Sequence, residues 1–411
     1  EYTCNCGDYY HHDNYSVDTD TTWGDYLPTT TATEAPPGVL RIENTLTIQS
    51  GVTLTLDPDV TLEFGAYGRI TVEQGAQLIV NGATLTNACA EPWQGIEVFG
   101  NDDSPQTSYY QGTVDLNEEA RIEYAKTGVS LIGHTQDFDI VWGTAGGIIT
   151  TDEATFYNCR RAIEFMKYQN VSSGGNLANN VSYLKNAQFI VDDGLNEVFD
   201  GGSLKQISMW GVQGVRLRNC DLENQISSTN TDEFNQFEGI GLLSINASFK
   251  LLANPTTFTF PTSESQYERS SISGFLAGVA VNNSDELSAL RINRTDFSNN
   301  YIGAYINNSL FSTLTRNTFG VTENETWAGS EGYASSFGLA LDHSTFYTVE
   351  ENVFTGDENP TTNTSGLSIF NSGYLDNEIY RNEFNDLVYG TMVYGNNGFN
   401  ASIFNTDFNL G

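Results

Sequence analysis

Residues 297–319 read FSNNYIGAYINNSLFSTLTRNTF and contain one full period of an internal repeat. The stretch begins at Phe297 and ends 22 residues later at Phe319. Between these rings lies the Gly-apolar-x-apolar run Gly303-Ala-Tyr-Ile306, which is followed by the polar turn Asn307-Asn308-Ser309. Short alternating runs predict strands, and Asn, Ser and Gly between them predict turns. The period therefore predicts one coil of short strands joined by tight turns.

The same period recurs along the C-terminal third of the chain. The distance from glycine to phenylalanine is 16 residues for Gly303 and Gly338, and 18 residues for Gly366 and Gly390. Acidic, Gly-rich insertions such as Val321–Ser336 lengthen some periods at one fixed phase, as loops on one face of a repeat protein do. The recurring residues are Gly278, Gly303, Gly338, Gly366, Gly390, Phe297, Phe319, Phe354, Phe384 and Phe408.

Weaker copies of this pattern reach back to Val39. The segment Leu46–Asn87 is a series of short alternating runs separated by Gly, Asn, Asp and Pro. These spacings are too short for helical crossovers, so consecutive coils must stack directly on one another. The sequence therefore predicts an all-β, right-handed parallel β-helix over residues 39–411. In such a solenoid the phenylalanines form a buried stack, and asparagines at the turns form a ladder that bonds the next coil.

Residues 1–38 have no lasting periodicity. They are polar, acidic and Thr-rich, and they end in Pro36-Pro37-Gly38. This composition is typical of linkers, so the segment is predicted to be an extended N-terminal arm. The chain begins at Glu1 and shows no signal peptide, which leads us to expect a mature form after signal removal, or a fragment.

The charge of the chain excludes several classes of partner. Its 52 acidic residues outnumber its 17 Lys and Arg residues and give a formal net charge of -35. Nucleic acids and anionic membranes require a basic face, so neither is an expected partner. The sequence has no run of about 18 apolar residues, so no membrane-spanning segment is expected. These properties favour an extracellular protein kept soluble by self-repulsion.

The five cysteines are an odd number, so at least one thiol is unpaired. Cys4 and Cys6 lie in the N-terminal segment, and a bridge from one of them to Cys89 would pin that segment to the first coils. The alternative is that the cysteines, including Cys159 and Cys220, are free or buried thiols.

The segment Leu46–Asn87, followed by Glu91-Pro-Trp93-Gln-Gly95-Ile-Glu-Val98-Phe-Gly100-Asn101, resembles the first coils of large secreted parallel β-helix surface proteins of Bacteroidetes-type bacteria. These proteins belong to the pectin-lyase-like superfamily. The resemblance implies export to the cell surface. The superfamily includes polysaccharide lyases and hydrolases, so an active site has to be considered.

Candidate catalytic groups are few. Asp192 and Asp193 could mimic the paired carboxylates of the hydrolases, but no matching acid–base pair can be assembled, and the alternative is a solvated loop. A lyase needs a basic residue to take a proton from an acidic sugar, and the tight basic clusters are Arg160-Arg161 and the pair Arg216 and Arg218. The alternative for these arginines is ion pairing with the many carboxylates. No catalytic residue is therefore assigned.

An acidic motif near the N-terminus is the candidate metal site. Asp18, Asp20 and Asp25 are spaced along VDTDTTWGD, residues 17–25, as the oxygen ligands of calcium loops are. The motif lacks a bidentate Glu at the right spacing. These three residues are predicted calcium ligands, and the alternative is an acidic linker; no other cofactor is expected.

Three functions are compatible with the sequence. The preferred one is a non-enzymatic structural or adhesive surface protein, which self-assembles head to tail into filaments through its arm and its open solenoid ends. The alternatives are a carbohydrate-active enzyme, either a polysaccharide lyase or a hydrolase, and a carbohydrate-binding protein. Expected partners are accordingly other copies of the chain or cell-surface glycans. Aromatic residues outside the repeated phase are candidates for stacking on sugars: Tyr9, Tyr10, Tyr15, Tyr109 and Tyr110.

Overall fold

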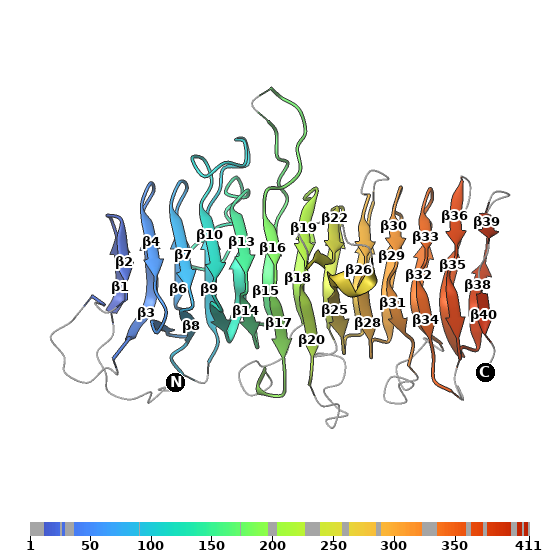
Figure 1. The fold of residues 1–411 in the computed structure, drawn as a ribbon. Helices are drawn as coiled ribbons and strands as arrows, with labels where there is room; N and C mark the ends of the chain where they lie inside the picture. Colours follow the sequence, from blue (N-terminus) through green and yellow to red (C-terminus); the bar gives the residue numbers. More distant parts are fainter. Residues whose placement is uncertain are drawn as a thin grey trace. The chain divides into compact units, whose positions relative to one another are not determined.

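The computed structural model describes residues 12–24, 27–28, 37–89, 91–172, 174–195, 204–226, 239–256, 263–284, 289–322, 335–358, 363–372, 376–395, 401–404 and 407–409. The chain divides into two compact units, Glu1–Val212 and Gln213–Gly411. In each unit, short strands pair in parallel with the equivalent strands of the neighbouring coils (Figure 1). The fold is therefore all-β and a parallel β-helix, as the repeat predicts.

In the first unit, three ladders of parallel strands follow the coils. The first ladder consists of β2 (Thr21–Trp23), β4 (Thr53–Leu56), β7 (Gln77–Asn81), β10 (Thr113–Asn117), β13 (Ile148–Asp152) and β16 (Tyr183–Lys185). The second consists of the start of β3 (Val39–Ile48), β5 (Thr61–Phe64), β8 (Thr84–Asn87), β11 (Arg121–Glu123), β14 (Thr155–Tyr157) and β17 (Gln188–Val191). The third consists of β1 (His12–Val17), the end of β3, β6 (Arg69–Val72), β9 (Trp93–Val98), β12 (Ala125–Ser130), β15 (Arg161–Phe165) and β18 (Lys205–Trp210).

The second unit repeats this arrangement. Its first ladder consists of β19 (Val215–Arg218), β22 (Phe249–Leu252), β27 (Arg291–Asn293), β30 (Thr313–Thr315), β33 (Thr348–Glu350), β36 (Asn377–Tyr380) and β39 (Ala401–Phe404). Its second consists of β20 (Asp221–Asn224), β25 (Ser270–Ser273), β28 (Thr295–Ser298), β31 (Thr318–Gly320), β34 (Val353–Thr355), β37 (Glu383–Asn385) and β40 (Asp407–Asn409). Its third consists of β21 (Ile240–Ile245), β26 (Ala277–Asn282), β29 (Ile302–Asn307), β32 (Ser335–Asp342), β35 (Asn363–Phe370) and β38 (Tyr389–Tyr394). An insertion between β22 and β25 contains β23 (Asn254–Pro255), the 3-10 helix η1 (Glu264–Gln266) and β24 (Tyr267–Glu268).

The core of the second unit contains the predicted aromatic stack. The rings of Phe297, Phe319, Phe354 and Phe384 lie face to face, with successive centroids 4.7, 4.8 and 4.9 Å apart and interplanar angles of 5°, 6° and 7°. All four side chains are buried. They share one inward position of the second ladder, where the strands are in register. The aromatic stack predicted from the period is therefore confirmed for these residues.

The recurring glycines of the third ladder stand where a side chain has no room. A Cβ atom at Gly303 would lie 2.4 Å from the carbonyl oxygen of Gly338 and 2.9 Å from Cδ1 of Phe319. Gly278 and Gly366 have the same two kinds of neighbour. The glycine repeat thus provides the space that the phenylalanine stack occupies.

Buried asparagines connect successive coils at the corner before the second ladder. Nδ2 of Asn317 donates to Oδ1 of Asn352, and Nδ2 of Asn352 donates to Oδ1 of Asn382, both at 2.9 Å. The same two acceptors also receive the backbone N–H groups of Asn317 and Asn352. Nδ2 of Asn352 in addition donates to the carbonyl oxygen of Leu314 at 2.9 Å. The predicted amide ladder is confirmed at this corner.

At the corner between the third and first ladders, serines make the equivalent contacts. The backbone N–H of Ser309 donates to Oγ of Ser344 at 3.2 Å, and the N–H of Ser344 donates to Oγ of Ser372 at 3.0 Å. Asn308 forms the bend of this turn, because its φ of 53° lies in the left-handed region that asparagine tolerates. Asn308 also links the coils, because its Nδ2 donates to the carbonyl oxygen of Asn283 at 2.8 Å.

The prediction that residues 1–38 form a detached arm is wrong for residues 12–23. β1 pairs with β3, and β2 pairs with β4, so these residues form a coil of the solenoid. Val17 and Trp23 occupy inward positions and are 4% and 2% exposed. The polar residues between them face outward and conceal the alternation in the sequence. The rest of the predicted arm, apart from residues 24, 27–28 and 37–38, lies outside the described residues.

The described cysteines differ in whether they form a disulfide. Cys89 is disulfide-bonded, whereas Cys159 and Cys220 are buried free thiols. Burial raises the pKa of Cys159 to about 12, which keeps it protonated and unreactive. Cys4 and Cys6, the predicted partners of Cys89, lie outside the described residues. No helix in the described part of the chain is long and apolar enough to cross a membrane.

Candidate functional site

The outward surface of β9, β12, β15 and β18 in the first unit carries a row of polar side chains. We call this surface the third-ladder face. Parallel register places Glu97 beside Ser130, Ser130 beside Glu164, and Glu164 beside Ser208. Since equivalent positions of a parallel ladder lie one strand spacing apart, the row runs continuously along the coils.

Cationic side chains gather along the same face. Lys126, Arg161 and Lys205 lie on or at the start of its strands, and Arg160 directly precedes β15. Burial, and then the charge of Arg160, lower the pKa of Lys126. Burial, and then the charge of Arg161, lower the pKa values of Arg160 and Lys205. Each shift has a neighbouring cation among its causes, so the four positive charges lie close enough to repel one another.

Acidic groups offset this charge only in part. Arg161 forms an ion pair with Glu164, whose carboxylate also attracts Lys205. Glu91 exerts a weaker attraction on Lys126. Neither lysine forms an ion pair in the described part of the chain. Among the described residues, the third-ladder face therefore carries more cationic than acidic side chains, on a chain whose formal net charge is -35.

Several polar atoms of this face are buried and have no hydrogen-bond partner among the described residues. They are Oε2 of Glu97, Oγ of Ser130, Nε of Arg161 and Oγ of Ser208. Buried polar groups in native proteins are nearly always bonded to protein, ordered water or ligand. These four atoms lie on neighbouring strands beneath the charged side chains of the third-ladder face.

One end of the face is closed by a charged network. Nη1 of Arg69 lies 3.0 Å from Oε1 of Glu97 and donates to the carbonyl oxygen of Thr135 at 3.1 Å. Nδ1 of His134 lies 3.3 Å from the same carboxylate oxygen. The Phe138 ring covers the network, with its centroid 4.8 Å from Cζ of Arg69. The buried carboxylate thus fixes the loop after β12 on the third-ladder face.

Exposed aromatic and apolar side chains rise beside this network on two loops. Residues 99–112 follow β9 and residues 131–147 follow β12, and the N–H of Gly100 joins the loops by donating to the carbonyl oxygen of Thr144 at 2.7 Å. Tyr109 is 80% exposed and Trp142 is 69% exposed. The other exposed members of the group are Tyr110, Phe138 and Ile140.

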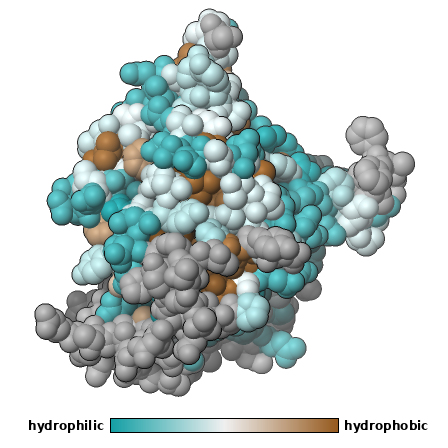
Figure 2. Space-filling model, turned by 90° about the vertical axis from the view of Figure 1, so that its left-hand side faces the viewer, coloured by the Kyte–Doolittle hydropathy of each residue, from teal (hydrophilic) through white to brown (hydrophobic). Residues whose placement is uncertain are grey.

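From the side of the first coils, the surface is mainly hydrophilic with small apolar patches (Figure 2).

The structure describes two of the three predicted calcium ligands. Asp18 and Asp20 are both exposed, and Oδ1 of Asp20 accepts the backbone N–H of Thr53 at 2.9 Å. Asp25 lies outside the described residues. Over the ranges that are described, no three His, Cys, Asp or Glu side chains are grouped to hold a metal ion. The calcium assignment therefore stays a prediction.

The carboxylate of Asp192 accepts hydrogen bonds from three neighbouring groups. Its carboxylate accepts from the hydroxyl of Tyr157 at 2.5 Å, from Nδ2 of Asn158 at 2.8 Å and from the N–H of Gly194 at 2.9 Å. Burial acts to raise the pKa of Asp192, but these hydrogen bonds outweigh it, so the pKa is lowered. A carboxylate held in this way connects the turn at Gly194 to the neighbouring coil.

Of the remaining candidate residues that are described, some pack against neighbouring side chains and others are exposed. Tyr15 packs edge to face against Trp23, with centroids 5.6 Å apart. Arg216 and Arg218 lie on β19 in the second unit, where Arg216 is exposed. Tyr9 and Tyr10 lie outside the described residues. Of the predicted stacking residues that are described, only Tyr109 and Tyr110 are exposed enough to meet a sugar.

A polar pocket of about 420 Å³ opens elsewhere on the first unit, beside β11, β14 and β17. Arg121, its one cation, is paired with Glu123 at 2.7 Å. This pocket is acidic, so it does not suit the same ligand as the third-ladder face. Its lining residues are Glu119, Arg121, Glu153, Ala154, Thr155, Asn186 and Gln188.

Comparison with known proteins extends to the fold alone. No family model and no curated protein matches the sequence. Similar solved structures include the periplasmic alginate epimerase AlgG, with 13% identity, coverage of 92% of this chain and 80% of that chain, and a TM-score of 0.38. A mannuronan C-5 epimerase A-module of Azotobacter vinelandii has 11% identity, coverage of 91% of both chains and a TM-score of 0.43. The surface adhesin PfbA of Streptococcus pneumoniae has 11% identity, coverage of 87% and 85%, and a TM-score of 0.31.

Proposed function

We propose that this chain is a non-enzymatic, adhesive surface protein that binds acidic glycan chains through the third-ladder face of its first unit. The observation that carries the proposal is the convergence of Lys126, Arg160, Arg161 and Lys205 on one face of a strongly acidic chain. Uronate carboxylates are suitable partners for such cations.

The net negative charge of the chain does not prevent this binding. Charges further apart than about 8 Å are largely screened at physiological ionic strength, whereas contacts on a partly buried face are screened much less. Local cations therefore decide the affinity, and distant carboxylates mainly slow the approach of the ligand. The Phe138 ring has its centroid 6.0 Å from Nζ of Lys126 and so borders the cationic face, and the exposed Trp142 belongs to the same loop; both offer rings against which a sugar can stack.

The double variant Lys126→Gln/Lys205→Gln tests the site. We expect its affinity for polygalacturonate of defined length to fall by about tenfold, because each ion pair that is lost is worth up to about 1 kcal/mol. Isothermal titration calorimetry gives the affinity. The matched control is Lys250→Gln/Arg291→Gln, which removes two exposed cations that are adjacent in register on the second unit.

The pH dependence provides a second readout of the same experiment. Because the pKa values of Lys126 and Lys205 are lowered from 10.5, both side chains lose their charge at a lower pH than an ordinary lysine does. Affinity should therefore fall as the pH rises towards 10.5, and the double variant should lack this fall. Equal affinities of wild type and double variant, or equal binding of a neutral polymer, would contradict the proposal. Release of reducing ends or unsaturated products would instead assign an enzyme.

Self-association is a second candidate function, and the exposure of β38 favours it. Val393 is in register with Ile369, which is buried at 1%, yet Val393 itself is 51% exposed. Val388, Tyr389 and Tyr394 are exposed around it. A second copy that packs on this apolar surface would cover a residue at a core phase of the repeat.

The first coil helps to decide whether the contact between two copies is head-to-tail or isologous. In the described part of the first coil, Val17 and Trp23 are buried, so neither is available for an apolar contact with β38 of a second copy. We therefore propose an isologous dimer through β38 in place of the expected filament.

Val393→Lys should abolish this dimer, because the new charge would lie in the apolar contact. Light scattering after size-exclusion chromatography at high protein concentration measures the change. Leu177→Lys is the matched control, since Leu177 is 71% exposed on a loop of the first unit. A monomeric wild-type chain at high concentration would rule the dimer out.

A further inference from the structure

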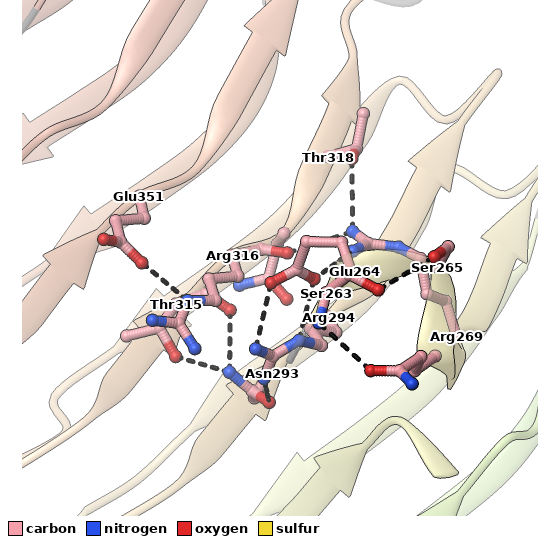
Figure 3. A network of polar contacts seen from close by, with 12 residues as sticks. Ser263, Glu264, Ser265, Arg269, Asn293, Arg294, Thr315, Arg316, Thr318 and Glu351 are labelled. Atoms are coloured by element: carbon pink, nitrogen blue, oxygen red, sulfur yellow. Dashed lines mark hydrogen bonds and ion pairs between the residues drawn. The ribbon is translucent and has the colours of Figure 1, made fainter. Parts of the chain in front are cut away.

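The insertion between β22 and β25 directs a carboxylate at an arginine of the solenoid. Oε2 of Glu264 accepts from Nε of Arg294 at 2.8 Å, and Oε1 accepts from Nη2 at 3.0 Å (Figure 3). This is a bidentate contact, the geometry in which arginine recognises carboxylates most specifically. Glu264 belongs to η1, a single three-residue turn, whereas Arg294 belongs to the corner between β27 and β28.

Arg294 is held in place independently of Glu264. The residue is 7% exposed, and its Nη1 donates to Oδ1 of Asn293 at 3.0 Å. Its guanidinium lies over the ring of Tyr267, with Cζ 4.0 Å from the centroid. A buried, hydrogen-bonded and stacked guanidinium is a preorganised receptor for an anion.

Two further arginines add positive charge around the same carboxylate. Nη1 of Arg269 lies 3.8 Å from Oε2 of Glu264, and Arg316 attracts the carboxylate from further away. The hydrogen bond from Arg294 is the main reason that the pKa of Glu264 is lowered. Arg269 is itself fixed, because it donates to Oδ1 of Asp296 at 2.8 Å and to the carbonyl oxygen of Arg316 at 3.0 Å.

The carboxylate is the exposed member of this cluster. The Glu264 side chain is 57% exposed, whereas that of Arg294 is 9% exposed. Solvent therefore reaches the carboxylate but hardly reaches the arginine. The contact thus has the arrangement of a receptor and its ligand, although both belong to one chain.

We infer that Arg294, Arg269 and Arg316 form a carboxylate-binding site that Glu264 occupies as an internal stand-in, and that a carboxylate of an acidic sugar chain binds there in its place. The choice of an acidic sugar rests on the proposed function; the site itself rests on the contacts of the second unit. An intramolecular carboxylate competes with every external one, so the site binds weakly until Glu264 is displaced.

Glu264→Gln should unmask the site. This change keeps the shape of the side chain but removes the carboxylate partner of the largely buried Arg294, which is an unfavourable state that an external anion relieves. Arg269 and Arg316 keep their ion pairs with Asp296 and Glu351. We expect trigalacturonate to bind the variant about tenfold more tightly than it binds the parent. Glu268→Gln is the matched control, because Glu268 lies on the same insertion, at β24, and its side chain bonds only the half-buried Asn254 among the described residues.

The experiment uses the full chain in the Lys126→Gln/Lys205→Gln background, so that the third-ladder face contributes little. Adding Arg294→Gln should abolish the gain, and Arg294→Lys, which keeps the charge but loses the bidentate donor pair, should reduce it. Thermal unfolding of each variant confirms that it is folded. The methyl ester of trigalacturonate, which has no carboxylate charge, should bind none of the variants.

The outcomes separate this site from the proposed function. No gain in a folded Glu264→Gln variant, or a gain that survives Arg294→Gln, overturns the internal stand-in whatever the third-ladder face does. Conversely, a gain at Glu264→Gln supports the stand-in even if Lys126 and Lys205 prove irrelevant to polygalacturonate.

Discussion

Asn352→Ala is expected to lower the free energy of unfolding of the second unit by about 4 kcal/mol. The wild-type side chain is fully buried and joins three coils: it donates to Leu314 and Asn382, and it accepts two N–H groups of Asn317. Alanine cannot replace any of these bonds. Each buried group that loses its partner costs about 1–3 kcal/mol, so several losses at one residue add up to a large effect.

Urea-induced unfolding measured by circular dichroism will test this effect. The matched control is Asn307→Ala, because Nδ2 of Asn307 also donates to an asparagine of the neighbouring coil, Asn282, but does so in solvent. Its cost should stay below about 0.5 kcal/mol, as is usual for a surface position. Similar losses for the two variants would show that the ladder at Asn352 does not depend on burial.

Gly303→Ala should destabilise the second unit by about 3 kcal/mol. The added methyl group would lie 2.4 Å from a backbone carbonyl oxygen, that of Gly338, and 2.9 Å from the Phe319 ring. Neither neighbour can yield cheaply, since the first belongs to a paired strand and the second to the aromatic stack. The substitution therefore forces β29 and β32 apart.

Gly320→Ala is the matched control for this prediction. Gly320 also lies in a strand of the second unit, but a Cβ atom there would come no closer than 3.4 Å to any neighbour, the carbonyl oxygen of Phe297. Its free energy of unfolding should be within about 1 kcal/mol of wild type, or higher, because alanine restricts the unfolded chain. A large loss at Gly320 and none at Gly303 would refute the packing argument.

The period of Phe297 and Phe319 predicts the fold because a solenoid repeats its contacts along with its residues. Each residue at a given phase meets the residue of the same phase one coil later, so a pattern in the sequence becomes a row in space. Residues 12–23 were not predicted to belong to the solenoid. Their only apolar inward positions are Tyr15, Val17 and Trp23, which are too few to show a period, and their partners β3 and β4 lie further along the chain.

The candidate site was less accessible to sequence analysis. Arg160-Arg161 stood out as a basic pair, but Lys126 and Lys205 are single lysines in unremarkable surroundings. Lys126 and Lys205 lie near Arg160 and Arg161 because the strands that carry them are neighbours in the third ladder. The loops between these strands differ in length, so the sequence spacing of the four residues does not show that they are close in space. The Glu264 contact was equally hidden, since an insertion folds back on its corner through side-chain contacts that have no periodic signature.

The buried asparagines of the second unit connect each coil to both of its neighbours. Nδ2 of Asn352 donates to Leu314 of the preceding coil and to Asn382 of the following coil, and its Oδ1 accepts two N–H groups of Asn317. The backbone N–H groups of Asn317 and Asn352 obtain these acceptors only when the next coil is in place. A finished coil therefore still presents donors to the segment that follows it, and we expect the solenoid to extend coil by coil in the order of synthesis.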